Sequence, residues 1–101
     1  MRLRYTASAR RHLQYIFDFI AERNPPAARR VITEIRTAAT RLSEFPHRGR
    51  TGQQSGTREL VVLGTPYIVI YEIWPASEEI VVLAIMHGAQ DRGTSSEQIP
   101  E

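Results

Sequence analysis

The 101-residue sequence contains no cysteine and no lysine, and its hydrophobic runs are short. The absence of cysteine excludes disulfides and thiolate metal sites, which fits a reducing compartment. The apolar run that begins at Ile80 is far shorter than the roughly 20 residues that cross a bilayer as a helix. Residues 1–5 also lack the shape of a signal peptide. The sequence therefore predicts a single domain that is soluble and cytoplasmic.

Because lysine is absent, all 13 basic residues are arginines, and they are unevenly distributed. Residues 1–58 hold twelve arginines and four acidic residues, a balance of +8. Residues 59–101 hold one arginine and seven acidic residues, a balance of −6, and the two balances sum to +2. Single arginines on helices are usually solvated and contribute little. A strongly basic half of a chain nevertheless favours an acidic or polyanionic partner.

Two amphipathic helices are predicted by apolar residues that recur at three- and four-residue spacing. Thr6 or Ser8 can cap the first helix, because each hydroxyl can accept a hydrogen bond from a free helical N–H. The segment Asn24-Pro25-Pro26 ends that helix and suits the first turn of the second. The second helix is expected to end near Phe45-Pro46. The two helices therefore form a hairpin with one shared apolar side.

Four β-strands are predicted, one before the helical hairpin and three after it. The connections between the last three are short, which favours antiparallel neighbours. The strand-forming runs are residues 2–5, 57–63, 67–71 and 80–89. We therefore expect an α+β fold in the order β-α-α-β-β-β, with both helices packed on one face of the sheet. This domain is expected to span residues 1–92, and the polar residues 93–101 are expected to form a flexible tail.

Several short motifs occur in a fixed order along the chain. They include the run Asn24-Pro25-Pro26-Ala27-Ala28, the Gly49-Arg50 loop, Arg58-Glu59-Leu60 at a strand start, and residues 85–89. Together they resemble the ParE branch of the RelE/ParE toxin superfamily, and the resemblance covers residues 3–92. It implies the toxin of a bacterial type II toxin–antitoxin system, of the plasmid-stabilisation kind. A cognate antitoxin would neutralise the toxin in a hetero-oligomer.

The resemblance implies a choice between two activities. The ParE branch is associated with inhibition of DNA gyrase, and the RelE branch with ribosome-dependent cleavage of messenger RNA. Metal-free RNA cleavage needs a base, an acid and a cation. Similar nucleases carry a basic residue where this chain has Ile68, and a polar neighbour of the last-strand histidine where it has Met86 and Gly88. These departures favour a gyrase inhibitor that acts by binding.

Two alternatives remain open beside gyrase inhibition. A degenerate toxin would bind only its antitoxin, whereas a nuclease would need catalytic residues. The candidate catalytic residues of a nuclease are His87, Arg58 and Arg50. The demanding geometry of catalysis favours another role for His87, which can close its strand or contact a partner.

No metal or cofactor site is predicted. The three histidines lie on different predicted elements and lack paired ligand spacing. We also expect no membrane partner, and direct contact with nucleic acid only in the nuclease alternative.

Arginines and exposed apolar residues are the candidate contacts for the antitoxin and for gyrase. Arg48, Arg50 and Arg58 are expected on one concave rim that could bind carboxylates or phosphates. Arg58 could instead hold its loop by donating to carbonyl groups. A disordered antitoxin could lay an amphipathic helix against outward apolar side chains and add a strand to an open sheet edge. The predicted apolar contacts are Tyr15, Phe19 and Val31, and the other candidates are Trp74, His87 and Arg92.

Overall fold

The computed structural model describes residues 1–89, which form a layer of two helices and a five-stranded sheet. The predicted α+β order is confirmed, and a short strand, β2, is added to it. The elements are β1 (Arg2–Tyr5), α1 (Ala7–Ala21), α2 (Pro25–Arg41), the 3₁₀ turn η1 (Pro46–Arg48), β2 (Arg50–Thr51), β3 (Arg58–Val61), β4 (Tyr67–Trp74) and β5 (Glu79–His87). The predicted tail at 93–101 lies outside the described residues.

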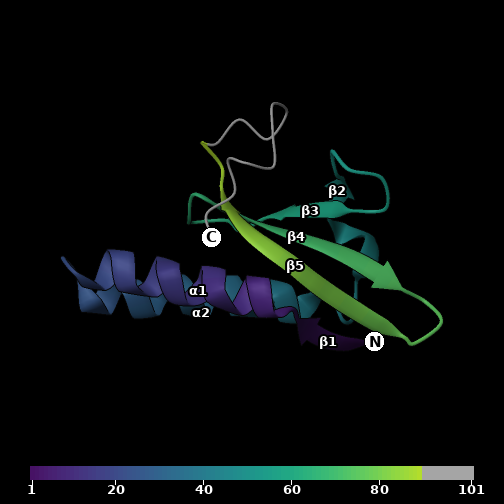
Figure 1. The fold of residues 1–101 in the computed structure, drawn as a ribbon, viewed down its shortest axis with the longest axis horizontal. Coiled ribbons are helices and arrows are strands. Elements are labelled where there is room, and N and C mark those ends of the chain that lie inside the picture. The colour runs from purple at the N-terminus through teal and green to yellow at the C-terminus, as the bar shows by residue number, and fades with distance from the viewer. Residues whose placement is uncertain (90–101) are drawn as a thin grey trace.

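The sheet is mixed, with the strand order β1-β5-β4-β3-β2. The predicted antiparallel pairing of the last three strands is confirmed for β3, β4 and β5. β1, however, pairs in parallel with β5, with Arg2 opposite Glu79 and Tyr5 opposite Val82. A parallel neighbour requires a long connection, which the helical hairpin and the later strands supply. Figure 1 shows α1 and α2 side by side along the sheet.

Local side-chain caps fix the start of each helix. The Thr6 hydroxyl accepts from the Ala9 N–H at 3.1 Å, so Thr6 is the N-cap of α1. The same hydroxyl donates to the Leu83 carbonyl at 3.2 Å, which ties the start of α1 to β5. The Asn24 side chain accepts from the Ala27 N–H at 3.0 Å and caps α2. Neither helix in this part of the chain has the length and apolar character needed to cross a membrane.

The main core lies between the helices and the sheet. It takes apolar side chains from α1, α2, β3, β4 and β5, and Tyr67 and Tyr71 of β4 belong to it. The expectation that Val31 faces outward is wrong, because its side chain is only 6% exposed. Val31 precedes Ile35 by one turn of α2, so the two share the buried face.

Candidate functional site

A hollow lined largely by aromatic residues lies between α1 and the paired residues Tyr67 and His87. Its volume is about 120 Å³. On its rim Tyr15 and Phe19 stack with their centroids 6.3 Å apart and their planes at 15°. These two rings are 52% and 63% exposed, which confirms that they face outward. This aromatic hollow comprises His12, Tyr15, Ile16, Phe19, Tyr67, Ile85 and His87.

His87 closes β5 and forms one wall of the aromatic hollow. Its Nδ1 accepts from the Ala89 N–H at 3.0 Å, and its ring meets the Tyr67 ring edge to face at 5.4 Å. The Gly88 N–H donates to the Pro66 carbonyl at 2.6 Å, which fixes the turn after the strand. No arginine among residues 1–89 lines this hollow. The histidine therefore has aromatic neighbours there rather than the cation that RNA cleavage needs.

His12 is a structural residue whose part in this site the sequence analysis missed. It is buried, and its Nδ1 accepts from the Ile85 N–H at 3.1 Å, which joins α1 to β5 beneath the aromatic hollow. An acceptor at Nδ1 requires the tautomer with a proton on Nε2. The available signal was the spacing of His12 from Ile16, which places the histidine on the buried face of α1.

Replacing His12 with leucine should lower the free energy of unfolding by about 1–2 kcal/mol, because the Ile85 N–H loses its acceptor. His12→Asn should cost less, because its side-chain oxygen can occupy the place of Nδ1. Denaturant unfolding measures both losses. Equal losses for the two variants would show that the hydrogen bond contributes nothing.

Two tyrosines should make the fold sensitive to alkali. Burial raises the pKa of Tyr67, and the Tyr15 hydroxyl raises it further. Burial also raises the pKa of Tyr5, an effect that the Arg36 guanidinium partly offsets.

Because the folded-state pKa values lie above the usual value of 10, this contribution to stability is complete below pH 10. It is lost as the pH rises through the folded-state values. We expect the melting temperature of the wild type to fall above pH 10, and to fall less steeply for Tyr67→Phe. Parallel curves for the two proteins would contradict this assignment.

Arg58 holds the loop that carries η1. Its Nε and Nη2 donate to the Gly49 carbonyl at 3.0 and 2.7 Å, and Nη2 also reaches the His47 carbonyl at 3.4 Å. The expectation that Arg58 holds its loop by donating to carbonyl groups is therefore confirmed. These bonds occupy much of the guanidinium that a nuclease would direct at phosphate.

The expectation of a single arginine rim is wrong. Arg50 pairs with the buried Glu59, with Nη2 and Oε1 3.1 Å apart. Since Arg50 lies opposite Glu59 in the ladder, both side chains project on one face of the sheet, and the neighbouring Arg58 projects on the other. Arg48 lines a different hollow, beside β3. The three arginines therefore serve three different contacts.

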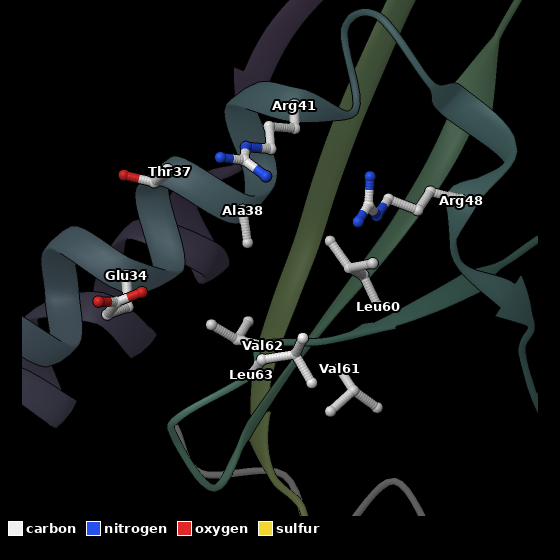
Figure 2. A pocket seen from close by; sticks show the side chains of 9 residues that line it. All are labelled: Glu34, Thr37, Ala38, Arg41, Arg48, Leu60, Val61, Val62 and Leu63. Carbon is white, nitrogen blue, oxygen red and sulfur yellow. The ribbon is translucent and has the colours of Figure 1, made fainter.

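The hollow beside β3 is lined by Arg48 and by Arg41, a residue that the sequence analysis did not single out. Figure 2 shows the Arg48 side chain extending toward α2, whereas the Arg41 side chain runs back along α2. The hollow has a volume of about 180 Å³. We call it the β3-edge hollow. Its lining residues are Glu34, Thr37, Ala38, Arg41, Arg48, Leu60, Val61, Val62 and Leu63. The sequence signal for this hollow was the three- and four-residue spacing of residues 34, 37, 38 and 41, which places them on one face of the second helix.

The remaining candidates lie elsewhere. Trp74 ends β4 with an exposed ring, which Arg4 covers at 5.0 Å from its guanidinium carbon to the ring centroid. The indole N–H donates to Glu72 at 2.8 Å. Arg92 lies outside the described residues. Within residues 1–89 no group of three histidine or acidic side chains could hold a metal ion.

Sequence comparison connects this fold to known toxins. Residues 3–92 match the family described as ParE toxin of the type II toxin–antitoxin system parDE. "Putative toxin Y4kP" of Sinorhizobium fredii is 42% identical over 89 residues, which cover 88% of this chain and 90% of that protein. "Toxin RelE2" of Caulobacter vibrioides is 36% identical over 86 residues, covering 85% and 93%.

Solved structures show the same arrangement. A chain of the chromosomal ParDE TA system from P. aeruginosa superposes with a TM-score of 0.77 at 23% identity, covering 86% of this chain and 95% of that one. At this identity the likeness shows the fold. A chain of the toxin–antitoxin complex RelBE2 from Mycobacterium tuberculosis gives a TM-score of 0.65 at 28% identity, covering 85% and 95%. The chain belongs to the ParE toxin family of type II toxin–antitoxin systems.

Proposed function

We propose that this toxin inhibits DNA gyrase by binding it and that a cognate antitoxin neutralises the toxin. The composition of the aromatic hollow is the observation that carries this proposal. It combines His87 with exposed aromatic side chains, and no arginine of the described chain lines it. Exposed apolar concavities are typical of protein-binding surfaces. A gyrase target implies action in the cytoplasm.

The position that similar nucleases fill with a cation supports binding over cleavage. Ile68 occupies it, and this side chain is buried in β4. Arg50 is engaged with Glu59, and Arg58 with loop carbonyls. The candidate cations of a nuclease are therefore committed to structural contacts, whereas cleavage needs a cation free to stabilise the developing phosphorane charge.

An antitoxin partner is consistent with the exposed Tyr15 and Phe19. A structural neighbour belongs to a toxin–antitoxin complex. A disordered antitoxin segment could fold into an amphipathic helix whose apolar face covers these rings. Because such a segment orders itself on binding, it loses part of its binding free energy and stays accessible to proteolysis when released.

A gyrase supercoiling assay tests the proposed target. We expect the purified chain to slow supercoiling or to trap cleaved DNA at micromolar concentration. Adding the protein encoded by the adjacent reading frame, which we expect to have an acidic amphipathic end, should restore supercoiling. Normal supercoiling at micromolar toxin, together with growth arrest in cells, would exclude gyrase as the target.

A further inference from the structure

The aromatic hollow leaves the arginine excess of the helical hairpin without a role. Residues 7–41 hold seven arginines and three acidic residues, a balance of +4. The ion pairs within residues 1–89 involve only Arg2, Arg4 and Arg50, all of which lie on strands. None of the seven hairpin arginines therefore pairs with a carboxylate in the described part of the chain. Such an excess of positive charge favours an anionic partner.

Two of these arginines are held on the same residue, Tyr5 of β1. Arg10 Nη1 donates to the Tyr5 carbonyl at 2.8 Å. The guanidinium carbon of Arg36 lies 5.4 Å from the centroid of the Tyr5 ring, which is a cation–π contact. Tyr5 thus joins one cation of α1 to one cation of α2. Because like charges repel each other, an anion bound between the two guanidinium groups would stabilise this arrangement.

A groove between α1 and α2 adjoins this arginine pair. We call it the hairpin groove, and its volume is about 400 Å³. Its lining residues are Arg10, Leu13, Gln14, Phe17, Ile32 and Arg36. The apolar members are buried or half-buried and form the floor, whereas the two arginines and the glutamine are exposed. The hairpin groove therefore carries cations above an apolar base, and it shares no lining residue with the aromatic hollow.

Arg29 extends this positive charge along α2. It is exposed and precedes Arg36 by two helical turns, or about 10 Å, so both arginines lie on the face of α2 that carries Ile32. A single carboxylate could bridge Arg10 and Arg36, but it would leave Arg29 without a partner. One strand of DNA carries a phosphate for about every 3.4 Å of its axis, so it presents about three phosphates over this length. The row of arginines therefore suits a phosphate backbone better than an isolated acidic side chain.

We propose that the hairpin groove binds the phosphate backbone of the DNA that gyrase holds. The inference rests on the proposed inhibition of gyrase and deepens it, because the toxin becomes a ligand of the gyrase–DNA complex rather than of gyrase alone. Arg10, Arg29 and Arg36 would contact phosphates, and the apolar floor would lie against deoxyribose. Phosphate contacts carry no sequence information, so this contact should not depend on the DNA sequence. Nucleic-acid contact, expected above only for a nuclease, thus extends to a toxin that acts by binding.

The affinity of the toxin for gyrase with and without DNA tests the inference. Immobilised gyrase, either alone or loaded with a linear duplex, is titrated with the wild-type chain. We expect the gyrase–DNA complex to bind at least tenfold more tightly at low salt, and this advantage to fall as the salt concentration rises. Equal affinities for gyrase and for the gyrase–DNA complex would overturn the inference.

Matched substitutions show whether the hairpin groove supplies this advantage. Arg10→Gln with Arg36→Gln should reduce the preference for the gyrase–DNA complex to about threefold or less and leave the affinity for gyrase alone unchanged. The slope of log affinity against log salt should fall by about 2, since two phosphate contacts are lost. Arg41→Gln with Arg48→Gln makes the same charge change on exposed residues of the β3-edge hollow and should retain the wild-type preference. An equal loss in both double variants would show that net charge acts rather than the groove, which would overturn the inference.

A milder variant keeps the test decisive if Arg10→Gln with Arg36→Gln does not fold, which circular dichroism melts establish. Arg29→Gln changes an exposed side chain that takes no part in the Tyr5 contacts, and it should lower the salt slope by about 1. An unchanged slope for this variant would exclude Arg29 from the phosphate contacts and overturn the proposed row of arginines.

The outcomes separate the DNA contact from the proposed function. If the wild-type chain neither binds gyrase in either form nor slows supercoiling, gyrase inhibition fails and the DNA contact fails with it. If the wild type slows supercoiling but binds both forms equally well, only the DNA contact is overturned. Polyglutamate that displaces the toxin from the gyrase–DNA complex better than free duplex does, at equal concentration of charge, would also overturn it, because an acidic protein would then be the better occupant of the groove.

Discussion

Replacing Tyr71 with phenylalanine should lower the free energy of unfolding by about 3 kcal/mol, because two backbone groups lose a shared partner. The Tyr71 hydroxyl donates to the Pro46 carbonyl at 2.6 Å and accepts from the Gly49 N–H at 2.9 Å. The side chain is fully buried, so water cannot easily replace the hydroxyl. A Cβ at Gly49 would lie 2.7 Å from the same oxygen, which shows how closely the loop packs there. Denaturant unfolding measures the loss.

Tyr5→Phe is the matched control for this prediction. The Tyr5 hydroxyl is buried and has no hydrogen-bond partner in the described part of the chain. Its removal therefore leaves no backbone group unsatisfied, and we expect a change within about 0.5 kcal/mol at neutral pH. Similar losses for the two variants would show that the deleted oxygen matters in itself, and that the contacts of Tyr71 with the loop do not.

Truncating both rings on the rim of the aromatic hollow should weaken antitoxin binding about 100-fold. The double variant Tyr15→Ala and Phe19→Ala removes the stacked pair, which is the largest exposed aromatic surface on α1. Alanine suits a helix, and both rings are exposed, so the fold should be retained. Titration calorimetry with the protein encoded by the adjacent reading frame measures the affinity.

Phe45→Ala serves as the control, because Phe45 is an exposed phenylalanine that lines neither the aromatic hollow nor the β3-edge hollow. We expect this variant to bind as the wild type does. An unchanged affinity of the double variant would remove the aromatic hollow from the antitoxin interface.

The fold was largely predictable because local signals and the global arrangement agree. Helical periodicity, the Asn24 cap and the prolines that follow it mark the helical hairpin, and short turns mark the antiparallel strands. The parallel partner of β1 was not predictable in this way. That pairing joins Arg2 to Glu79 across most of the chain, and no local pattern specifies such a contact. The two-residue β2 is too short to produce a periodic signal.

The site was predictable only in part. Spacing on α1 indicated that Tyr15 and Phe19 face outward, and the structure confirms it. Sequence spacing could not reveal that Arg48, Arg50 and Arg58 make separate contacts. These contacts depend on which face of the sheet each strand residue occupies and on the Glu59 carboxylate that pairs with Arg50. The role of His12 was hidden for a similar reason. Its partner is a backbone N–H of β5, which leaves no mark in the side-chain sequence.

Primer extension on translated messages tests most directly whether this toxin acts by binding a protein target or by cleaving messenger RNA. Messages are translated with the wild-type chain and, in parallel, with His87→Ala. We expect no discrete cuts in either reaction, because His87 meets aromatic rings in the hollow and the candidate cations Arg50 and Arg58 are engaged in structural contacts elsewhere. Discrete cuts with the wild type that disappear with His87→Ala would contradict it and establish a ribosome-dependent nuclease.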